Sequence, residues 1–356
     1  MCIRDRDTTW ETGIVYTLGG RIAVLSGVTL TIEPGVIIKG QAGTGSNATA
    51  LLIARGATLN AAGTEAEPII FTSVADEIEP GDIASPNLDP TLNGLWGGLI
   101  VLGNASISAD AESVQIEGIP ASDQNGLYGG TDDGDNSGVL KYISIRHGGA
   151  NIGEGNEING LTLGGVGSGT VIENIEIVSN QDDGIEWFGG AVSVKNAIVW
   201  NTGDDAIDTD QAWAGTLDNF VIVSPGDKCF ELDGGEGDFN DEHTISNGSV
   251  SAGISQGLAD LDKKGLAGTV GNSYVNMNQI YFTDVTEGQT FDEYSPELTA
   301  SDLEIVLPSG NLTDFFLDGT DVFASAVAEG ANTVGADISL LESWSWAGVS
   351  GALTGL

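Results

Sequence analysis

Residues 171–235 read VIENIEIVSNQDDGIEWFGGAVSVKNAIVWNTGDDAIDTDQAWAGTLDNFVIVSPGDKCFELDGG, and this stretch contains one acidic element three times. The three copies are NQDDGIEWFGG, TGDDAIDTDQA and PGDKCFELDGG. Their leading acidic residues, Asp182, Asp204 and Asp227, follow one another at spacings of 22 and 23 residues. A short fixed period predicts a fold built from stacked, similar units.

A second motif shares this period. The segments between the acidic elements, VIENIEIV, VSVKNAIVW and TLDNFVIV, superpose, and Asn174, Asn196 and Asn219 recur in them at the same spacings. The period is too short for a propeller blade and lacks the frame of a leucine-rich repeat, but it suits one turn of a parallel β-helix. We therefore predict an all-β, single-stranded right-handed parallel β-helix, a solenoid of roughly 10 to 13 coils.

Stacked coils place equivalent residues in columns, so inward columns should be apolar in every coil. Three columns meet this expectation: Ile175, Ala197 and Phe220; Ile177, Val199 and Ile222; and Ile185, Ile207 and Phe230. The charged residues that alternate with them should face solvent, namely Glu176, Glu186, Asp208 and Glu231. The small residues Gly184, Ala206 and Cys229 are predicted to share this outward face.

Composition restricts the function. The 356 residues include 11 Lys and Arg against 52 Asp and Glu, which gives a formal net charge of −41. Binding to nucleic acids or to anionic membrane surfaces needs clustered basic residues, so nucleic acids are excluded as partners and anionic membrane surfaces are disfavoured. Because no apolar run approaches a membrane span, we also expect no membrane insertion. With 40% hydrophobic residues the chain should nevertheless fold.

The chain divides into two unequal parts. We interpret residues 1–6, MCIRDR, as a non-native scar because their composition differs from everything that follows. Residues 7–356 then form a single β-helix domain. Exposed strand edges at its ends need covers, and we expect TWETGIVYTLGG and LESWSWAGVSGAL to supply them.

The N-x-x-x-G-I and D-D-A-I elements resemble those of right-handed parallel β-helix proteins of the pectate-lyase-like superfamily. The opening stretch, GVTLTIEPGVIIKG followed by LLIARGATL and WGGLIVLGNA, is similar to secreted or surface β-helix proteins of Bacteroidota. The resemblance implies a place outside the cell or on its outer surface, with the leader peptide missing from this sequence. It also implies a polysaccharide, a surface glycan or another surface protein as partner.

The outward columns carry many carboxylates, and three interpretations of them compete. Like charges about 5 Å apart repel by roughly 1 kcal/mol in water and about 3 kcal/mol at an effective dielectric constant of 20. In the first interpretation, water and salt screen this face and there is no site. In the second, the carboxylates bind a divalent cation, for which Ca²⁺ is the candidate. The metal ligands would be Asp182, Asp204, Asp227, Glu186, Asp208 and Glu231.

The third interpretation is catalysis. Asn180-Gln181-Asp182 followed by Asp204-Asp205 is similar to the N-x-D element and Asp pair of polygalacturonase-type glycoside hydrolases. That resemblance implies Asp182, Asp204, Asp205 and Asp208 as catalytic residues. The chain departs from the pattern one coil later, where Asp227-Lys228-Cys229 replaces the family's G-H-G element, and we expect Lys228 to neutralise Asp205.

Substrate contacts are expected beside these carboxylates. Trp213 follows Asp210 in a loop and would stack on a sugar ring, with Glu186 and Asp210 as further contacts. We therefore predict a secreted or cell-surface β-helix that binds glycan or mediates adhesion and is stabilised by calcium. The alternative is a polysaccharide-degrading hydrolase or lyase that uses the carboxylates of the outer face.

Overall fold

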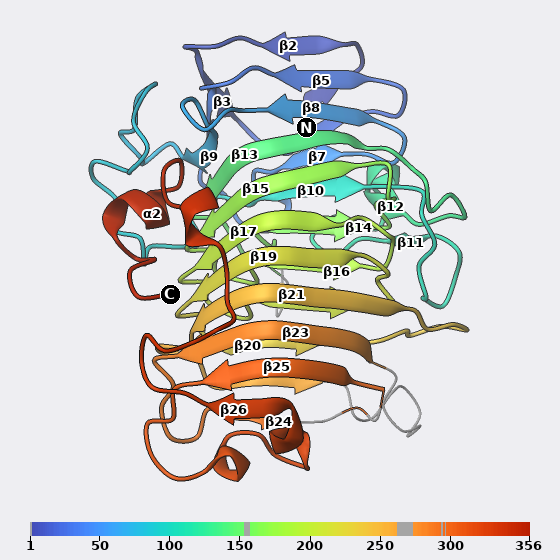
Figure 1. Cartoon of the computed structure of the whole chain (residues 1–356). Helices are drawn as coiled ribbons and strands as arrows, with labels where there is room; N and C mark the ends of the chain where they lie inside the picture. The colour runs from blue at the N-terminus through green and yellow to red at the C-terminus, as the bar shows by residue number, and fades with distance from the viewer. Residues whose placement is uncertain (1, 153–156, 262–272, 293–294, 296) are drawn as a thin grey trace.

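The computed structural model describes residues 2–152, 157–261, 273–292, 295 and 297–356. Their strands are parallel along two long sheets and stack as successive coils (Figure 1). Sheet A contains ten strands in the order β1 (Cys2–Arg4), β4 (Ile22–Val24), β7 (Leu51–Ile53), β10 (Leu99–Leu102), β14 (Leu161–Gly164), β16 (Ile185–Phe188), β18 (Ile207–Asp210), β20 (Lys228–Leu232), β22 (Gly257–Leu261) and β24 (Phe291–Asp292).

Sheet B faces sheet A across the core. Its main path is β2 (Thr8–Trp10), β5 (Thr29–Ile32), β8 (Thr58–Ala62), β13 (Gly138–Arg146), β15 (Val171–Val178), β17 (Val194–Trp200), β19 (Thr216–Val223), β21 (Glu242–Ser251), β23 (Tyr274–Thr283), β25 (Thr299–Ile305) and β26 (Ala324–Ala326). A side path adds β3 (Val15–Leu18), β6 (Ile37–Gly40) and β9 (Ile69–Ser73). The predicted right-handed parallel β-helix is confirmed, with a coil number at the low end of the expected range.

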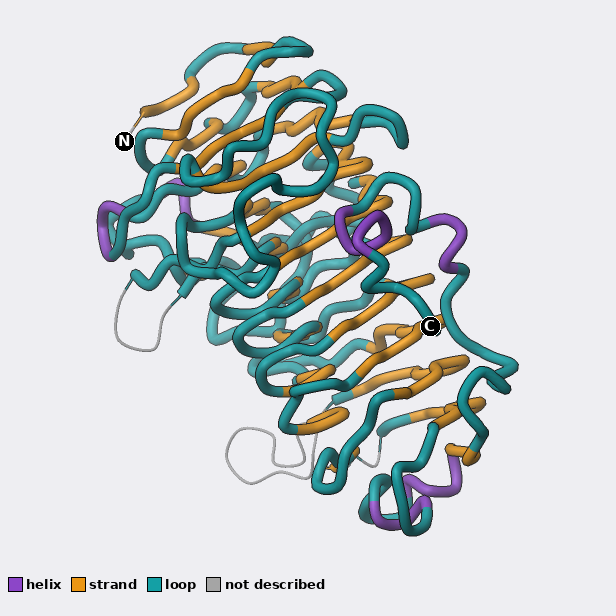
Figure 2. Tube along the Cα trace, turned by 90° about the vertical axis from the view of Figure 1, so that its left-hand side faces the viewer, coloured by secondary structure: helices purple, strands orange, loops and turns teal. Residues whose placement is uncertain are grey.

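The remaining elements are short. An antiparallel hairpin joins β11 (Val114–Gln115) and β12 (Leu127–Tyr128). The helical turns are η1 (Gly45–Asn47), η2 (Gln124–Gly126), η3 (Leu312–Asp314), η4 (Thr320–Phe323), η5 (Ile338–Leu340) and α2 (Trp346–Ser350). Figure 2 shows how loops connect the strands of successive coils.

The recurring asparagines bend the strands of sheet B. Asn174, Asn196 and Asn219 adopt left-handed backbone conformations with φ of 58°, 58° and 57°, which Asn tolerates better than most residues. The Asn196 side-chain amide donates to Asn174 Oδ1 at 3.0 Å, and that of Asn219 donates to Asn196 Oδ1 at 2.8 Å. This amide ladder holds the bend in register from coil to coil.

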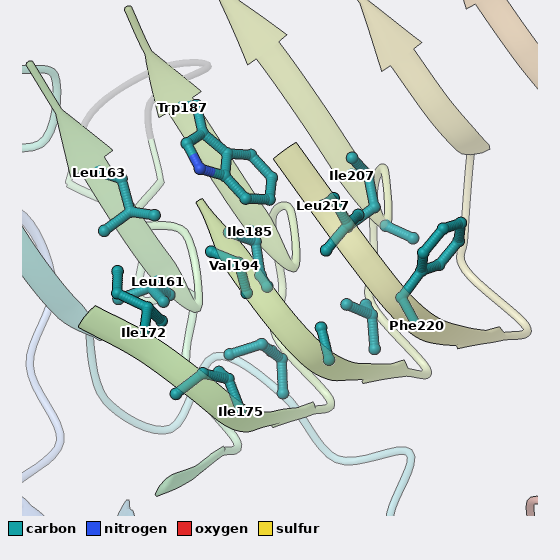
Figure 3. Close-up of a cluster of buried hydrophobic side chains, with 14 of the residues drawn as sticks. Leu161, Leu163, Ile172, Ile175, Ile185, Trp187, Val194, Ile207, Leu217 and Phe220 are labelled. Carbon is teal, nitrogen blue, oxygen red and sulfur yellow. The ribbon is translucent and has the colours of Figure 1, made fainter. Parts of the chain in front are cut away.

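The three predicted inward columns are confirmed. Ile175, Ala197 and Phe220 pair in sheet B, and Ile185, Ile207 and Phe230 pair in sheet A. All are buried in the central cluster, part of which Figure 3 shows. The prediction for the small column was wrong: Ala206 and Cys229 belong to this cluster, so they face inward.

The outer face of sheet A is covered only in its first half. Residues 103–137, which we call the cover segment, pack Ile107, Ile116 and Tyr128 onto the apolar outer residues Leu52 and Ile100. The same outer column continues through Thr162, Glu186, Asp208, Glu231, Asp260 and Asp292. The column therefore becomes acidic from β16 onward. The prediction that Glu186 faces solvent was wrong, because its side chain is buried at the edge of the cover segment.

The outer face of sheet B is covered over most of its length. There the pairing column runs through Glu176, Ile198 and Val221, and all three are buried. The prediction that Glu176 faces solvent was wrong, because residues 327–356, which we call the strap, lie over this face (Figure 1).

The strap also corrects the expected C-terminal cover. LESWSWAGVSGAL lies beside β13–β19 and not over the last coil. Phe315 and Phe316 are buried at the last coil instead, where Phe316 forms a bridge with Phe291. At the other end, β2 is the terminal strand of sheet B, and β1 pairs with β4 although its residues fall in the stretch interpreted as a scar. Met1 lies outside the described residues.

Candidate functional site

The turns that lead into β16, β18 and β20, together with β16 and β18 themselves, bring seven carboxylates together on the outer side of sheet A. We call them the acidic cluster: Asp182, Asp183, Glu186, Asp204, Asp205, Asp208 and Asp227. They form three overlapping groups, Asp182–Asp183–Asp204, Asp183–Glu186–Asp208 and Asp204–Asp205–Asp227. Within each group one oxygen of every carboxylate lies within 4.8 Å of the others. The predicted column of Asp182, Asp204 and Asp227 is thus part of a larger cluster.

Backbone amides fix two buried members of the cluster. The Asp205 amide donates to Asp183 Oδ1 at 2.9 Å, and the Lys228 amide donates to Asp205 Oδ1 at 2.5 Å. Each carboxylate therefore accepts from the equivalent position of the next coil. The regular stacking of coils, which aligns Ile185, Ile207 and Phe230, places these groups one above another.

The strands themselves supply the second part of the cluster. Glu186 pairs with Asp208, and Asp208 pairs with Glu231. Glu186 is buried, and its Oε2 accepts a hydrogen bond from the Asn159 side-chain amide. Asn159 is itself only 1% exposed, and its Oδ1 has no hydrogen-bond partner in the described part of the chain. An oxygen ligand is therefore available beside Glu186.

Burial and mutual repulsion favour the protonated forms of these acids. Burial raises the pKa of Asp205 to about 10, with further contributions from a hydrogen bond with Glu231 and the charge of Asp183. Burial, followed by the charges of Glu117 and Glu157, raises the pKa of Asp182 to about 7. The cluster can thus hold protons at neutral pH when no cation is bound.

Other members behave in the same way. The pKa values of Asp183, Glu186 and Asp208 lie well above their ordinary values, first because of burial and then because of neighbouring carboxylates. The pKa of the exposed Asp204 is also raised, by desolvation and then by Asp227. Strong, shared perturbation of this kind is typical of functional sites, although structural clusters show it too.

Lys228 provides a positive charge at one edge of the cluster. Its Nζ lies 2.8 Å from Asp227 Oδ1, so the side chain pairs with Asp227. The expectation that this side chain neutralises Asp205 was wrong, since Asp205 is contacted by the Lys228 backbone amide. The positive charge therefore sits at the rim, and the buried carboxylates depend on hydrogen bonds.

An open pocket of about 430 Å³ separates the cover segment from the acidic coils. Tyr128 and Phe188 lie in its lining with ring centroids 6.0 Å apart. The Tyr128 hydroxyl donates to Gln211 Oε1 at 2.9 Å, and Gln211 Nε2 donates to Glu236 at 3.1 Å. The pocket thus combines apolar walls with polar groups in fixed positions, as small-ligand sites do.

The structure corrects one predicted substrate contact. Trp213 is fully buried, stacks on Trp187 at a centroid distance of 4.5 Å and donates its indole N–H to Val192 O at 2.8 Å. It is therefore a core residue, and it cannot stack on a sugar. Of the other two contacts, Glu186 lies in the acidic cluster, and Asp210 is half-buried with a pKa raised by burial and by Asp233.

Sequence reasoning missed Asp183, Asn159 and Glu117. The paired letters of D-D-G-I and D-D-A-I, together with N-G-L one coil earlier, place Asn159, Asp183 and Asp205 at one position of the repeat. That signal was available. Glu117 could not be found in this way, because it comes from the cover segment, which lies outside the repeat; it joins the site through its contact with Asn159.

The described residues contain no helix that is long and apolar enough to cross a membrane. Comparison with curated proteins found no match, and comparison with solved structures found none either. A family model described as a pectate-lyase-like beta helix domain matches residues 2–315. The family model names no group of organisms, so the likeness to Bacteroidota surface proteins stays a prediction. The matched residues cover nearly all of the coils, and the match indicates a carbohydrate-related role. The chain therefore belongs to the pectate-lyase-like β-helix family.

Proposed function

We propose that the acidic cluster binds Ca²⁺ and that the protein uses this face outside the cell to bind a polysaccharide or surface glycan. The observation that carries the proposal is the overlap of three carboxylate groups, each with oxygens within 4.8 Å of one another. Calcium takes six to eight oxygen ligands in flexible geometry. Stacked coils supply such oxygens without rearrangement.

Three further features support a cation. Burial, and after it repulsion between neighbouring carboxylates, raises the pKa values of Asp183, Glu186 and Asp208, and a divalent positive charge would relieve that repulsion. The unpartnered Asn159 Oδ1 is a neutral ligand of the kind that calcium accepts. Asp204 and Asp182 remain accessible enough for an ion to enter from solvent.

Glycan binding rests on the family and on the neighbouring pocket. The pocket lined by Glu117, Phe188 and Gln211 adjoins the acidic cluster, since Glu117 contacts Asn159. A protein with a net charge of −41 repels an anionic polymer unless cations intervene. We therefore propose a neutral glycan, or an acidic one bridged by the bound calcium.

Calorimetry tests the cation directly. We expect CaCl₂ to raise the melting temperature and to give a saturable titration isotherm, and EDTA to reverse both effects. The double variant Asp183→Asn, Asp208→Asn should lose the isotherm while keeping the fold, because the amide oxygen introduced by Asp183→Asn can still accept from the Asp205 amide. Glu329→Gln removes an exposed carboxylate far along the chain and serves as the matched control. A melting temperature that changes with neither calcium nor EDTA would exclude a stabilising calcium site in the acidic cluster.

Glycan binding needs its own measurement. A panel of neutral and uronate-containing polysaccharides should be tested by affinity electrophoresis with calcium and with EDTA. We expect at least one polymer to retard the protein, and Phe188→Ala to weaken that retardation without changing calcium binding. Retardation by none of the polymers would remove the glycan and leave the cation site standing.

Cleavage of a glycosidic bond is the second candidate, and the pKa of Asp182 favours it. A carboxyl group with a pKa of about 7 beside a more exposed acid, Asp204, is the arrangement that lets one residue act as acid and the other as base or nucleophile. We expect any release of reducing ends to be abolished in Asp204→Asn. If no polysaccharide in the panel yields reducing or unsaturated ends, the enzyme hypothesis fails.

A further inference from the structure

The strap contacts the β-helix at widely separated coils. The amide of Thr333 donates to Glu304 at 2.6 Å, that of Ala336 to Ser249 at 3.0 Å, and that of Asp337 to Asn219 at 2.6 Å. Farther along, the amide of Ala347 donates to Glu176 Oε1 at 2.8 Å. These acceptors lie on β25, β21, β19 and β15, so the strap crosses the sheet lengthwise (Figure 1).

Two tryptophans fix the far end of the strap. The Trp344 ring meets Tyr142 edge-on at 5.6 Å, and the Trp346 ring meets Trp200 edge-on at 5.9 Å. Both tryptophans are buried with Ile198 and Val221 of the sheet. Aromatic contacts of this kind add to the free energy of burial, so this end is the principal anchor.

The anchor also seals a buried charge pair. Arg146 and Glu176 are fully buried, with Nη2 and Oε2 3.7 Å apart. Neither terminal nitrogen of Arg146 has a hydrogen-bond partner in the described ranges, but the guanidinium lies 5.0 Å from the centroid of the Trp346 ring. If the strap undocked, water would reach this charge pair. Hydration of the two charges would lower the free energy of the open form and so favour release of the strap.

In a solenoid each coil contacts only its neighbours, so coils can open one after another from an end. A segment that joins β25 to β15 adds a connection across coils that do not touch. We propose that the strap is a lengthwise clamp: while it is docked, the coils from β15 to β25 open together, and after its release they open in sequence from the C-terminal end.

Hydrogen–deuterium exchange with mass spectrometry of the full chain tests this proposal. In the parent protein we expect the slowest amides of β15, β19, β23 and β25 to exchange at rates that agree within about threefold. The double variant Trp344→Ala, Trp346→Ala removes the anchor. In this variant we expect the amides of β25 and β23 to exchange about 100-fold faster than those of β15. Val349→Ala changes a half-exposed residue of the same helix and should leave the parent pattern unchanged.

A milder variant guards against misfolding. Gly335 has a φ of +132°, and a Cβ there would lie 2.8 Å from Ser249 Oγ, so Gly335→Ala should loosen the strap without touching the interior of the coils. We expect the same gradient of exchange with a smaller amplitude. Uniform acceleration of all four strands in both variants, or acceleration confined to residues under the tryptophans, would overturn the clamp.

Discussion

On the outer face of sheet A, Glu186, Asp208 and Glu231 form an acidic column, whereas the corresponding column of sheet B runs through Glu176, Ile198 and Val221 beneath the strap. The same coils build both faces. The difference lies in what covers them. The cover segment reaches one end of the acidic strands, at Phe188 and Gln211, and leaves Asp204 exposed, whereas the strap spans most of sheet B. The same coils therefore bury one outer face under a strap and leave acidic residues of the other accessible, where we propose that the ligand binds.

The largest expected effect comes from the buried charge on sheet B. Glu176→Ala leaves Arg146 buried without its partner, and we expect the free energy of unfolding to fall by about 3–5 kcal/mol. Urea denaturation provides the measurement. Glu173→Ala, which breaks the partly exposed pair with Lys141, is the matched control and should cost less than about 1 kcal/mol. Equal losses in the two variants would contradict the burial of the Arg146–Glu176 pair beneath the strap.

The apolar contact beneath the strap should come next. Ile198→Ala removes a fully buried side chain between sheet B and the strap, so we expect a loss of about 2–4 kcal/mol in urea denaturation. A polar substitution at the paired position of the next coil, Val221→Thr, should also destabilise. If Ile198→Ala were neutral, the strap would not be packed on this face in solution.

The acidic cluster on sheet A should make the folded protein less stable as pH rises, whereas carboxyl groups with lowered pKa values make a protein more stable as pH rises. The folded protein holds Asp205 at a pKa of about 10 and Asp182 at about 7, while both ionise near 4 when unfolded. The folded state therefore binds more protons between these values, and its stability falls as pH rises. We expect the melting temperature in EDTA to drop by several degrees from pH 5 to pH 8, and calcium to reduce the drop. A rise over this range would refute the pKa assignment.

The smallest effect should come from a single acid of the cluster. Asp208→Asn removes one of several like charges, and we expect it to raise the free energy of unfolding in EDTA by about 1 kcal/mol at pH 8. The same variant should weaken the stabilisation by calcium. Thermal unfolding with and without the ion measures both, and a destabilised variant in EDTA would show that Asp208 has a structural role.

The sequence predicted what the repeat controls. The columns of Ile175, Ala197 and Phe220 follow from spacing alone, and so does the meeting of Asp182 with Asp204. A further signal was present in the runs AIVW and FVIV at the ends of β17 and β19, since uninterrupted apolar runs indicate strands that are buried on both faces. The expectation that inward and outward residues alternate between core and solvent does not hold for these strands, because both of their faces are buried. Glu176 was therefore wrongly predicted to face solvent.

Other features could not be predicted from spacing. Trp213 follows two residues, Gln211 and Ala212, whose positive φ values of 54° and 58° turn the chain inward. Neither residue type favours this left-handed conformation, so the turn could not be predicted from the sequence. The site of the strap depends on residues more than 100 positions away, such as Asn219 beside Asp337. Such contacts are decided by the folded surface that the segment meets.

The amide ladder of Asn174, Asn196 and Asn219 has a consequence for how such a chain can change length. The middle residue, Asn196, both gives and receives the same kind of hydrogen bond, so a coil with its asparagine fits between two others. Duplication of a 22-residue unit would extend the ladder with the same type of hydrogen bond. The length of the rod is therefore free to vary during evolution in whole turns, provided that the strap grows with it.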